Sequence, residues 1–458
     1  MGLRVYNTLT GNKEEFVPRE EGRVSIYVCG VTPYDETHIG HARPSVIWDV
    51  IRKYLKSKGY AVTYVQNFTD VDDKIIARAQ QLGITTEELS SKYIQEYLDA
   101  MEALKVAPAD YHPRVSQHIS HIITMVEDLI AQGVAYVADG DVYFHVPAFE
   151  GYGKLSKQQV DELESGVRID VSENKRNPLD FALWKKSKPN EPSWDSPWGP
   201  GRPGWHIECS AMAMHYLGAG FDFHGGGMDL VFPHHENEIA QSEALTGCAF
   251  ARYWLHNGLI TVNDEKMSKS LGNFLTVSDL LAKYPSELLR FYILSTHYRS
   301  PLEFNEQKMQ EAKRGWRRLQ DTYKRLKEQY GQAAPAEPLA WAMEAFTEAM
   351  DDDFNTARAV AVCFDVVRYA NRPDCTEGAE AYAFLKQVAQ GILGVISEEA
   401  QAAVDTGLTA EVIDLLLTVR EKLREERNWA LADLIRDRLT ELGIVVEDTK
   451  EGPRWKVN

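Results

Sequence analysis

Residues 28–55 read VCGVTPYDETHIGHARPSVIWDVIRKYL, and this stretch decides the fold. It predicts the end of a buried strand, a turn marked by glycine and proline, and an amphipathic helix that begins near His41. Nucleotide-binding α/β domains hold phosphate at such a turn, because free backbone N–H groups and the helix dipole meet the anion there. The stretch has neither GxGxxG nor GxxxxGK[ST]. Instead, His38 and His41 can donate hydrogen bonds to phosphate, and Gly40 permits close approach. Taken alone, His-x-x-His at a helix start more often binds a metal or has no function.

Composition limits the class of protein. The chain has 458 residues, enough for two to four domains, and 44% hydrophobic and 26% charged residues are typical of soluble globular proteins. The formal net charge of -18 argues against indiscriminate binding of nucleic acid, although one domain can still carry a basic face. Five cysteines are too few, and an odd number, for a disulfide framework, so a reducing cytoplasm is expected. No apolar run approaches membrane-spanning length, so no membrane partner is expected.

Alternating strand and helix patterns predict an α/β fold with a Rossmann-like parallel sheet, a small insertion and an all-helical C-terminal arm that ends in a small α+β module. RVSIYVCG at 23–30 and AVTYVQNFTD at 61–70 read as strands on either side of the helix, which indicates a right-handed crossover. The predicted parts are a Rossmann-like domain in two halves (1–133 and 204–262), a connective insertion (134–203), a region with the KMSKS sequence (263–330), a helical bundle (339–400) and a terminal module (405–458).

Four residues far apart in the chain share one chemistry. Cys29 ends the first strand, Cys209 lies in WHIECSAM, and His234 and Glu238 lie in PHHENEIAQ. Positions i and i+4 of a helix project to one face, so His234 and Glu238 can grip one ion together. Two thiolates, an imidazole and a carboxylate form a plausible tetrahedral zinc set. The alternative is that both cysteines are inert buried residues and that HHENE is a solvated helix face.

The pentapeptide KMSKS at 266–270 places Lys266 and Lys269 on a loop that follows a predicted strand. Such a pentapeptide in isolation is usually a solvated loop. Downstream of the turn formed by His38, Ile39, Gly40 and His41 (the HIGH turn), the pentapeptide becomes a candidate for neutralising phosphate charge. The three glycines at 225–227 either allow a ligand to approach the backbone or simply form a turn.

VCGVTPYDETHIGH, GWHIECSAM, FHGGGMDLVFPHHENEIAQSE and KMSKSLGNF occur in this order ahead of a helical arm. Together they closely resemble the cysteinyl-tRNA synthetases, a family of class I aminoacyl-tRNA synthetases, over essentially the whole chain. The resemblance implies ATP-dependent activation of L-cysteine to cysteinyl-adenylate and transfer to the 3′ end of tRNA(Cys), with Mg²⁺ entering with ATP. It also implies one Zn²⁺ held by Cys29, Cys209, His234 and Glu238. The ion would select cysteine over serine through the thiolate and make an editing domain unnecessary.

The resemblance also assigns roles around the phosphates and the amino acid. His38, Gly40, His41, Lys266 and Lys269 are implied to bind ATP, with the histidines and lysines catalytic. Substrate-binding roles are implied for Gly30, for Thr69 and Asp229 (the substrate ammonium), and for Trp205 and His224 (the walls of the cysteine pocket). The residues alone leave Asp229 open as a solvated or capping carboxylate and Trp205 as a core residue.

The arm is implied to contact tRNA. The basic, aromatic-bearing helix between residues 281 and 327 can follow the phosphates of the stem, although aromatics at helical spacing usually mean core. Arg424, Trp429 and Asp433 are implied to read the anticodon, whereas periodicity alone favours Trp429 as a core anchor. A monomer is expected.

Two other functions remain open at this point. A related ligase type uses the same catalytic core to form cysteinyl-adenylate but passes cysteine to an amino-sugar acceptor, and it lacks the full anticodon-reading end. A zinc-stabilised adaptor without catalysis would leave the HIGH and KMSKS sequences unused.

Overall fold

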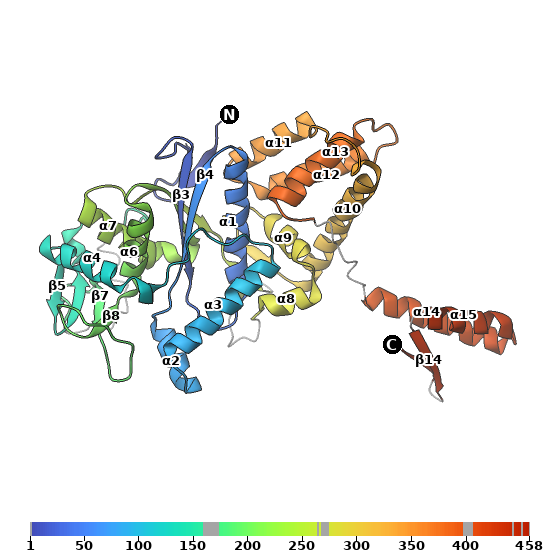
Figure 1. Ribbon diagram of the computed structural model, residues 1–458, viewed down its shortest axis with the longest axis horizontal. Coiled ribbons are helices and arrows are strands. Elements are labelled where there is room, and N and C mark those ends of the chain that lie inside the picture. The colour runs from blue at the N-terminus through green and yellow to red at the C-terminus, as the bar shows by residue number, and fades with distance from the viewer. Residues whose placement is uncertain are drawn as a thin grey trace. The chain divides into compact units, whose positions relative to one another are not determined.

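The computed structural model describes residues 2–158, 174–262, 265–266, 274–396, 406–441, 444–449 and 452–457 (Figure 1). The chain forms two compact units, Met1–Ser397 and Glu398–Asn458. Among the described residues, no helix has both the length and the apolar character needed to cross a membrane.

A four-stranded parallel sheet lies at the centre of the first unit, in the order β10-β9-β3-β4. Ile26 of the central strand pairs with Phe223 on one side and Tyr64 on the other. The two central strands are largely buried on both faces, including polar residues such as Asp222 and His224. The prediction of parallel strands joined by a helix is confirmed. Their bounds are β3 Arg23–Val31, β4 Ala61–Phe68, β9 Phe221–Gly227 and β10 Ala251–Asn257.

Helices cover both faces of this sheet (Figure 1). The helix after the first strand begins at Ile39, two residues earlier than expected, because the side chain of His38 caps it by accepting from the backbone N–H of Gly40. Residues 104–118 separate the two helices at 86–103 and 119–131. The bounds are α1 Ile39–Ser57, α2 Asp73–Leu82, α3 Thr86–Ala103, α4 Ile119–Ala131, α6 Trp205–Leu217 and α7 Glu236–Thr246, which a π-helical turn at Val231–His235 precedes.

The insertion is more regular than its loop-rich sequence suggests. It forms an antiparallel sheet in the order β5-β6-β7-β8, and the rings of Phe144 and Phe181 stack with centroids 5.0 Å apart. Trp184 of β7 is fully buried. Residues 159–173 lie outside the described part of the insertion. The strands are β5 Ala135–Ala138, β6 Asp141–Phe144, β7 Phe181–Lys186 and β8 Gly201–Pro203.

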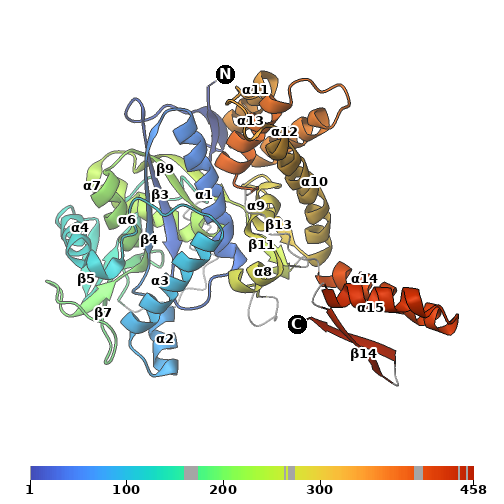
Figure 2. The ribbon, with the colours of Figure 1, turned by 45° about the vertical axis from the view of Figure 1, so that its right-hand side comes forward.

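A small second sheet follows the parallel one along the chain (Figure 2). Its central strand, β11, pairs with β13 in parallel and with β12 in the antiparallel sense. The elements of this region are β11 Ile260–Val262, β12 Glu265–Lys266, α8 Val277–Lys283, α9 Ser286–Leu294, β13 Leu302–Phe304 and α10 Glu306–Tyr330. An N-terminal hairpin of β1 Arg4–Asn7 and β2 Asn12–Glu15 contacts β10.

The first unit ends in a helical bundle, as the pattern from 341 to 396 predicts. Its core joins that of the α1 side of the sheet, because Tyr54 of α1 contacts the rings of Phe346 and Phe354 edge-on. The bundle contains α11 Ala340–Asp351, α12 Thr356–Ala370, α13 Gly378–Phe384 and a π-helical segment at Leu385–Ile392.

The second unit consists of two helices and a hairpin, which agrees with the small α+β module expected at the end of the arm. Ile413, Leu417, Leu439 and Ile444 form its small buried core. Its elements are α14 Thr406–Glu425, α15 Trp429–Glu441, β14 Ile444–Thr449 and β15 Gly452–Val457.

Candidate functional site

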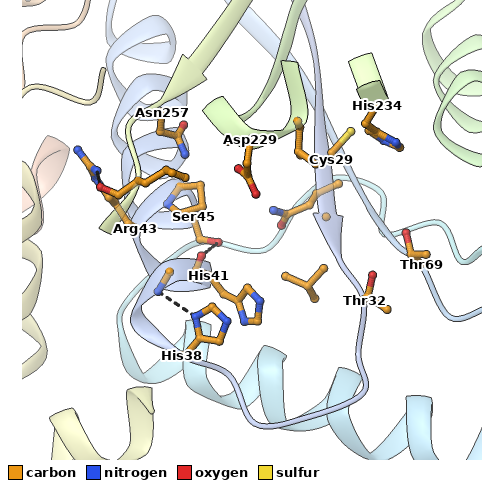
Figure 3. Close-up of a pocket in the computed structure, with 18 of the residues that line it drawn as sticks. Cys29, Thr32, His38, His41, Arg43, Ser45, Thr69, Asp229, His234 and Asn257 are labelled. Atoms are coloured by element: carbon orange, nitrogen blue, oxygen red, sulfur yellow. Dashed lines mark hydrogen bonds between the residues drawn. The ribbon is translucent and has the colours of Figure 1, made fainter. Parts of the chain in front are cut away.

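A cavity of about 390 Å³ opens at the carboxyl ends of the parallel strands, beside the first turn of α1 (Figure 3). Ligands of open α/β sheets bind at this edge, because the strand ends and the following helix N-termini converge there. Ten of the residues singled out in the sequence line the cavity: Cys29, Gly30, His38, Gly40, His41, Thr69, Trp205, Cys209, Asp229 and His234.

The two histidines of the HIGH turn stack on each other, with ring centroids 3.6 Å apart. Burial lowers the pKa of His38 to about 4, and burial together with the neighbouring His38 lowers the pKa of His41. Nδ1 of His38 accepts from the N–H of Gly40 at 3.1 Å, so a neutral His38 carries its proton on Nε2. Nδ1 of His41 is buried and has no partner among the described residues. Both rings therefore offer neutral hydrogen-bonding groups at the helix start.

Cys29, Cys209, His234 and Glu238 come together from three separate segments. Their ligand atoms all lie within 4.8 Å of one another. The two Sγ atoms are 3.7 Å apart, Sγ of Cys29 lies 3.5 Å from Oε1 of Glu238, and Nε2 of His234 lies 3.1 Å from the same oxygen. Cys29 lies near the end of β3, Cys209 in α6, His234 in the π-helical turn that precedes α7, and Glu238 in the first turn of α7. This donor set fits a tetrahedral zinc ion.

Neighbouring aromatic side chains orient two of these donors. Nε2 of His224 lies 2.9 Å from Oε2 of Glu238, and the Nδ1 atoms of His206 and His234 are 3.0 Å apart. Trp205 stacks on His234 with centroids 4.3 Å apart. Zinc-binding imidazoles and carboxylates are held in this way, by a further hydrogen bond on the atom that does not face the ion.

The surroundings of the four side chains favour the ionised forms of Glu238 and Cys209. Burial raises the pKa of Glu238, but His224 and His234 outweigh burial and lower it to about 2. A hydrogen bond from Cys29 lowers the pKa of the Cys209 thiol to about 6, whereas burial raises that of Cys29. A cation among these groups would stabilise both thiolates.

A second set of ligand atoms, from Cys29, His224, His235 and Glu238, is equally close. Nδ1 of His235 is 2.7 Å from Nε2 of His256, and the set has a single thiol. His224 and His235 are fully buried and do not line the cavity, whereas Cys209 and His234 do. Because the two sets share Cys29 and Glu238, they describe one ion site, and the set facing the cavity is the one a substrate can reach.

His224 corrects an expectation from the sequence. It was expected to line the amino-acid pocket, but it lies behind Glu238, with no exposed surface. Trp205 and Asp229 do face the cavity, and both are exposed.

Asn67 organises the cavity wall and was missed in the sequence. Its Oδ1 accepts from the N–H of Gly30 at 2.9 Å, and its Nδ2 donates to Oγ1 of Thr69 at 3.3 Å. A Cβ on Gly30 would lie 1.6 Å from the carbonyl oxygen of Asn67, so only glycine fits there. The available signal in the sequence was an asparagine, a residue depleted in strands, near the end of the predicted strand at 61–70.

The KMSKS lysines lie largely outside the described residues. Lys266 is described through its backbone, which pairs with Thr261 in the β11–β12 ladder. Its side chain and all of Lys269 are outside the described part of the chain.

The aromatic residues of α10 belong to the core. Trp316 and Tyr323 are buried, and the indole of Trp316 donates to the carbonyl of Val395 at 2.8 Å. A stem-contact role for this helix, expected from the sequence, would therefore have to rest on its charged residues.

In the second unit, Arg424, Trp429 and Asp433 lie on the surface. Trp429 is 55% exposed, so the interpretation of this residue as a core anchor is wrong. Asp433 forms an ion pair with Arg436 at 3.4 Å. All three implied anticodon residues are thus accessible to a partner.

Three family models match the chain in succession. Residues 15–314 match the tRNA synthetases class I (C) catalytic domain, residues 345–397 the DALR domain, and residues 405–455 the cysteinyl-tRNA ligase anticodon binding domain. Among solved structures, Mycobacterium tuberculosis methionyl-tRNA synthetase with methionyl-adenylate aligns with a TM-score of 0.59 at 15% identity, over 81% of this chain and 89% of that one. Agrobacterium radiobacter LeuRS in a ternary complex with tRNA aligns with a TM-score of 0.61 at 11% identity, over 82% and 85%. These likenesses concern the fold.

Curated relatives match over their full length. The cysteine–tRNA ligase of Pelotomaculum thermopropionicum is 52% identical, over 99% of both chains. That of Heliobacterium modesticaldum is 51% identical over 100% of both, and that of Geobacter metallireducens is also 51% identical over 100% of both. With the catalytic and anticodon-domain models and these full-length relatives in agreement, the chain belongs to the cysteinyl-tRNA synthetase family of class I aminoacyl-tRNA synthetases.

Proposed function

We propose that the chain activates L-cysteine with ATP to cysteinyl-adenylate and transfers the cysteinyl group to the 3′ end of tRNA(Cys). The observation that carries this proposal is the convergence of Cys29, Cys209 and His234 on the same cavity as His38 and His41. One end of that cavity suits a sulfur-bearing amino acid and the other suits phosphates. The full-length relatives named for this reaction support the same substrates.

In the activation step, a carboxylate oxygen of cysteine forms a bond to the α-phosphorus of ATP, and the bond from that phosphorus to pyrophosphate breaks. The nucleophile is already ionised, so the site needs no general base, only orientation and stabilisation of charge. Nε2–H of His38 and the ring of His41 lie where α1 begins and can donate to the phosphate oxygens. Lys266 and Lys269 are proposed to neutralise the developing charge, and Mg²⁺ to enter with ATP.

Cys29, Cys209, His234 and Glu238 would hold one zinc ion. When bound, the ion supplies a soft Lewis acid that prefers sulfur to a hydroxyl group, a discrimination that a simple small pocket cannot achieve. His206 would hold His234, and His224 would hold Glu238, in their binding orientations. Thr69 and Asp229, on the cavity wall, would bind the substrate ammonium.

The second unit would recognise the anticodon. Trp429 can stack on a base, and Arg424 and Asp433 can hydrogen-bond to base edges. The charged residues of region 263–330 would follow the stem of the tRNA. We further propose that the protein acts as a monomer in the cytoplasm, which suits its five free cysteines.

An amino-sugar acceptor is the second candidate, because it would need the same catalytic cavity. The match of residues 405–455 to an anticodon binding domain weighs against it, since that acceptor gives such a domain no role. An adaptor without catalysis would give the paired histidines of the HIGH turn no role.

Pyrophosphate exchange into ATP tests the proposal. Cysteine should support exchange and serine should not, and purified protein should contain about one zinc per chain. Comparable exchange with both amino acids would contradict selection by the metal, and no exchange with cysteine would contradict the activation step. Acylation of a tRNA(Cys) transcript, measured beside transfer to an amino sugar, separates the two acceptors.

A further inference from the structure

We propose that Arg43, two residues after the HIGH turn, is a positioning residue that holds the first turns of α1 against the small sheet containing Lys266. Only 1% of Arg43 is exposed, although it carries a charge. Among the described residues, no carboxylate pairs with it. Its guanidinium instead donates to main-chain carbonyls, and in Figure 3 it points away from Cys29 and Asp229. The proposal rests on the proposed function, because it concerns the activation step.

The carbonyls belong to two chain segments that meet beside α1. Nη1 donates to Gly258 at 2.6 Å and to Leu259 at 3.0 Å. Nη2 donates to Tyr298 at 3.3 Å, to His297 at 3.4 Å, and closely to Ser300. Burial lowers the pKa of Arg43 to about 10, so it stays a cation at neutral pH. Both terminal nitrogens are therefore committed to carbonyls, and the guanidinium cannot also present them as a fork to phosphate.

These segments lead directly into the small sheet. Gly258 and Leu259 join β10 to β11, and β11 pairs with the backbone of Lys266 through Thr261. Ser300 precedes β13, which pairs with β11 on its other edge. A Cβ on Gly258 would lie 2.4 Å from the carbonyl oxygen of Ser300, so the two segments are in close backbone contact. Arg43 thus contacts both segments just before they enter β11 and β13.

The second of these segments is held from its other side by Asp353, in the turn between α11 and α12. This carboxylate has no exposed surface and accepts from the hydroxyl of Tyr298 at 2.8 Å and from Nε of Arg299 at 2.7 Å. Asp353 has φ of 65°, a conformation that is costly for a residue other than glycine. The surrounding contacts maintain this conformation. Arg43 and Asp353 therefore clamp residues 297–300 between α1 and the helical bundle.

Activation requires phosphate-binding groups on α1 and on the KMSKS side to keep a fixed separation. A displacement of about 1 Å can lower a rate about 100-fold without removing any reacting group. Lysine cannot replace arginine here, because a single ammonium group does not span carbonyls of two segments. Replacement of Arg43 should lower the turnover of the activation step rather than the affinity for cysteine. The four side chains that would hold zinc lie on elements other than α1 and the small sheet.

Arg52 provides a matched control on the same helix. It is 5% exposed, and it donates to the carbonyls of Pro108 and Ala107 at 2.9 and 2.6 Å. Among the described residues it has no contact with the small sheet. Arg43→Ala and Arg52→Ala each remove a buried guanidinium from α1, but only the first should affect the activation geometry.

The test measures cysteine-dependent pyrophosphate exchange, zinc content and helical content for Arg43→Lys, Arg43→Ala and Arg52→Ala. We expect kcat to fall about 100-fold in Arg43→Ala and less in Arg43→Lys, with zinc content and the KM for cysteine within about twofold of the parent. Millimolar guanidinium chloride should raise the kcat of Arg43→Ala about tenfold and leave the kcat of Arg52→Ala unchanged. Asp353→Asn should show the same pattern as Arg43→Lys.

Unchanged kcat per folded molecule in Arg43→Ala would overturn the proposal. So would a parallel loss of zinc and of cysteine affinity, since that would show a general structural role. If Arg43→Ala does not fold, Arg43→Lys and Asp353→Asn decide: parental kcat in both overturns the proposal. Inactivity of the parent protein with cysteine would overturn the proposed function instead.

Discussion

The two units present their candidate functional residues in opposite ways. In the first, Cys209, His234 and Glu238 are at most 1% exposed and are held by further side chains from other segments. In the second, Trp429 is 55% exposed on a helix pair with only a small core. Chemistry on a small amino acid requires donors held within a fraction of an ångström, which packing provides. Recognition of a large flexible partner requires side chains that the partner can reach.

The largest effect should follow from replacing a buried donor. Cys209→Ser substitutes a much poorer zinc ligand at a buried position on the cavity wall. We expect zinc content near zero and cysteine-dependent exchange reduced more than about 100-fold, because even changes behind the ligands cost about 10- to 100-fold. Metal analysis and exchange assays measure both. Cys248→Ser, at an exposed cysteine, is the control and should match the parent. Full zinc content in Cys209→Ser would remove this residue from the metal site.

Burial at the HIGH turn also lowers the stability of the first unit in acid. The folded-state pKa of His38, about 4, lies below the value of roughly 6.5 for an unfolded histidine. Below pH 6.5 the unfolded chain therefore takes up a proton that the folded protein refuses, and the folded state loses stability until the pH nears 4.

His38→Asn should remove this loss while keeping a cap for α1, because asparagine is also a good N-cap residue. We expect the variant to lose about 3 kcal/mol less stability than the parent between pH 7.5 and pH 4. Urea denaturation of both proteins at the two pH values measures the difference. An identical acid response would show that His38 titrates normally.

Features set by local sequence could be predicted, whereas contacts set by tertiary packing could not. Local sequence predicts a helix at 205–217 and a strand at FDFHGG (221–226), and the structure has both. The spacing of His234 and Glu238 places them on one face by helix geometry alone. The meeting of Cys29 with Cys209 depends on tertiary packing across the sheet, so local pattern left it open and only the family resemblance supplied it.

The wrong expectations for His224 and Trp429, and the failure to identify Asn67, also arise from tertiary packing. Strand alternation indicates that His224 and Gly225 face opposite sides of β9, but it cannot say which side holds the ligand. The core of the second unit is completed by Ile413, Leu417, Leu439 and Ile444, and this leaves Trp429 outside despite its apolar character. Asn67 acts through backbone groups of a neighbouring strand, a contact that no spacing within its own strand encodes.

Trp429→Ala tests the exposed side of the comparison. Stacking on a base is worth about 1–3 kcal/mol, so tRNA acylation should fall about tenfold or more while cysteine-dependent exchange stays at the parental rate. The side chain is largely exposed, so thermal stability should hardly change. Leu415→Ala, which removes another apolar side chain with 62% exposure, is the matched control and should leave acylation intact. Equal damage to exchange and acylation would show that Trp429 supports the fold.

The smallest effect is expected at Asp433. Its carboxylate lies 3.4 Å from Arg436, which also pairs with Asp437 at 3.2 Å, and all three side chains are exposed. Surface pairs of this kind contribute less than about 1 kcal/mol, so neither Asp433→Asn nor Asp437→Asn should change stability measurably. An ionised carboxylate only accepts hydrogen bonds, so a base that donates to Asp433 would distinguish it from asparagine.

We therefore expect acylation to fall about threefold in Asp433→Asn and to stay at the parental rate in Asp437→Asn, with exchange unchanged in both. The expected decrease is small because only one hydrogen bond to a charged group is lost and the amide partly replaces it. Because both aspartates share Arg436, equal losses in the two variants would mean that the effect passes through the arginine. A loss confined to Asp433→Asn would instead locate the contact on the helix face one turn after Trp429, where a single base could touch both residues.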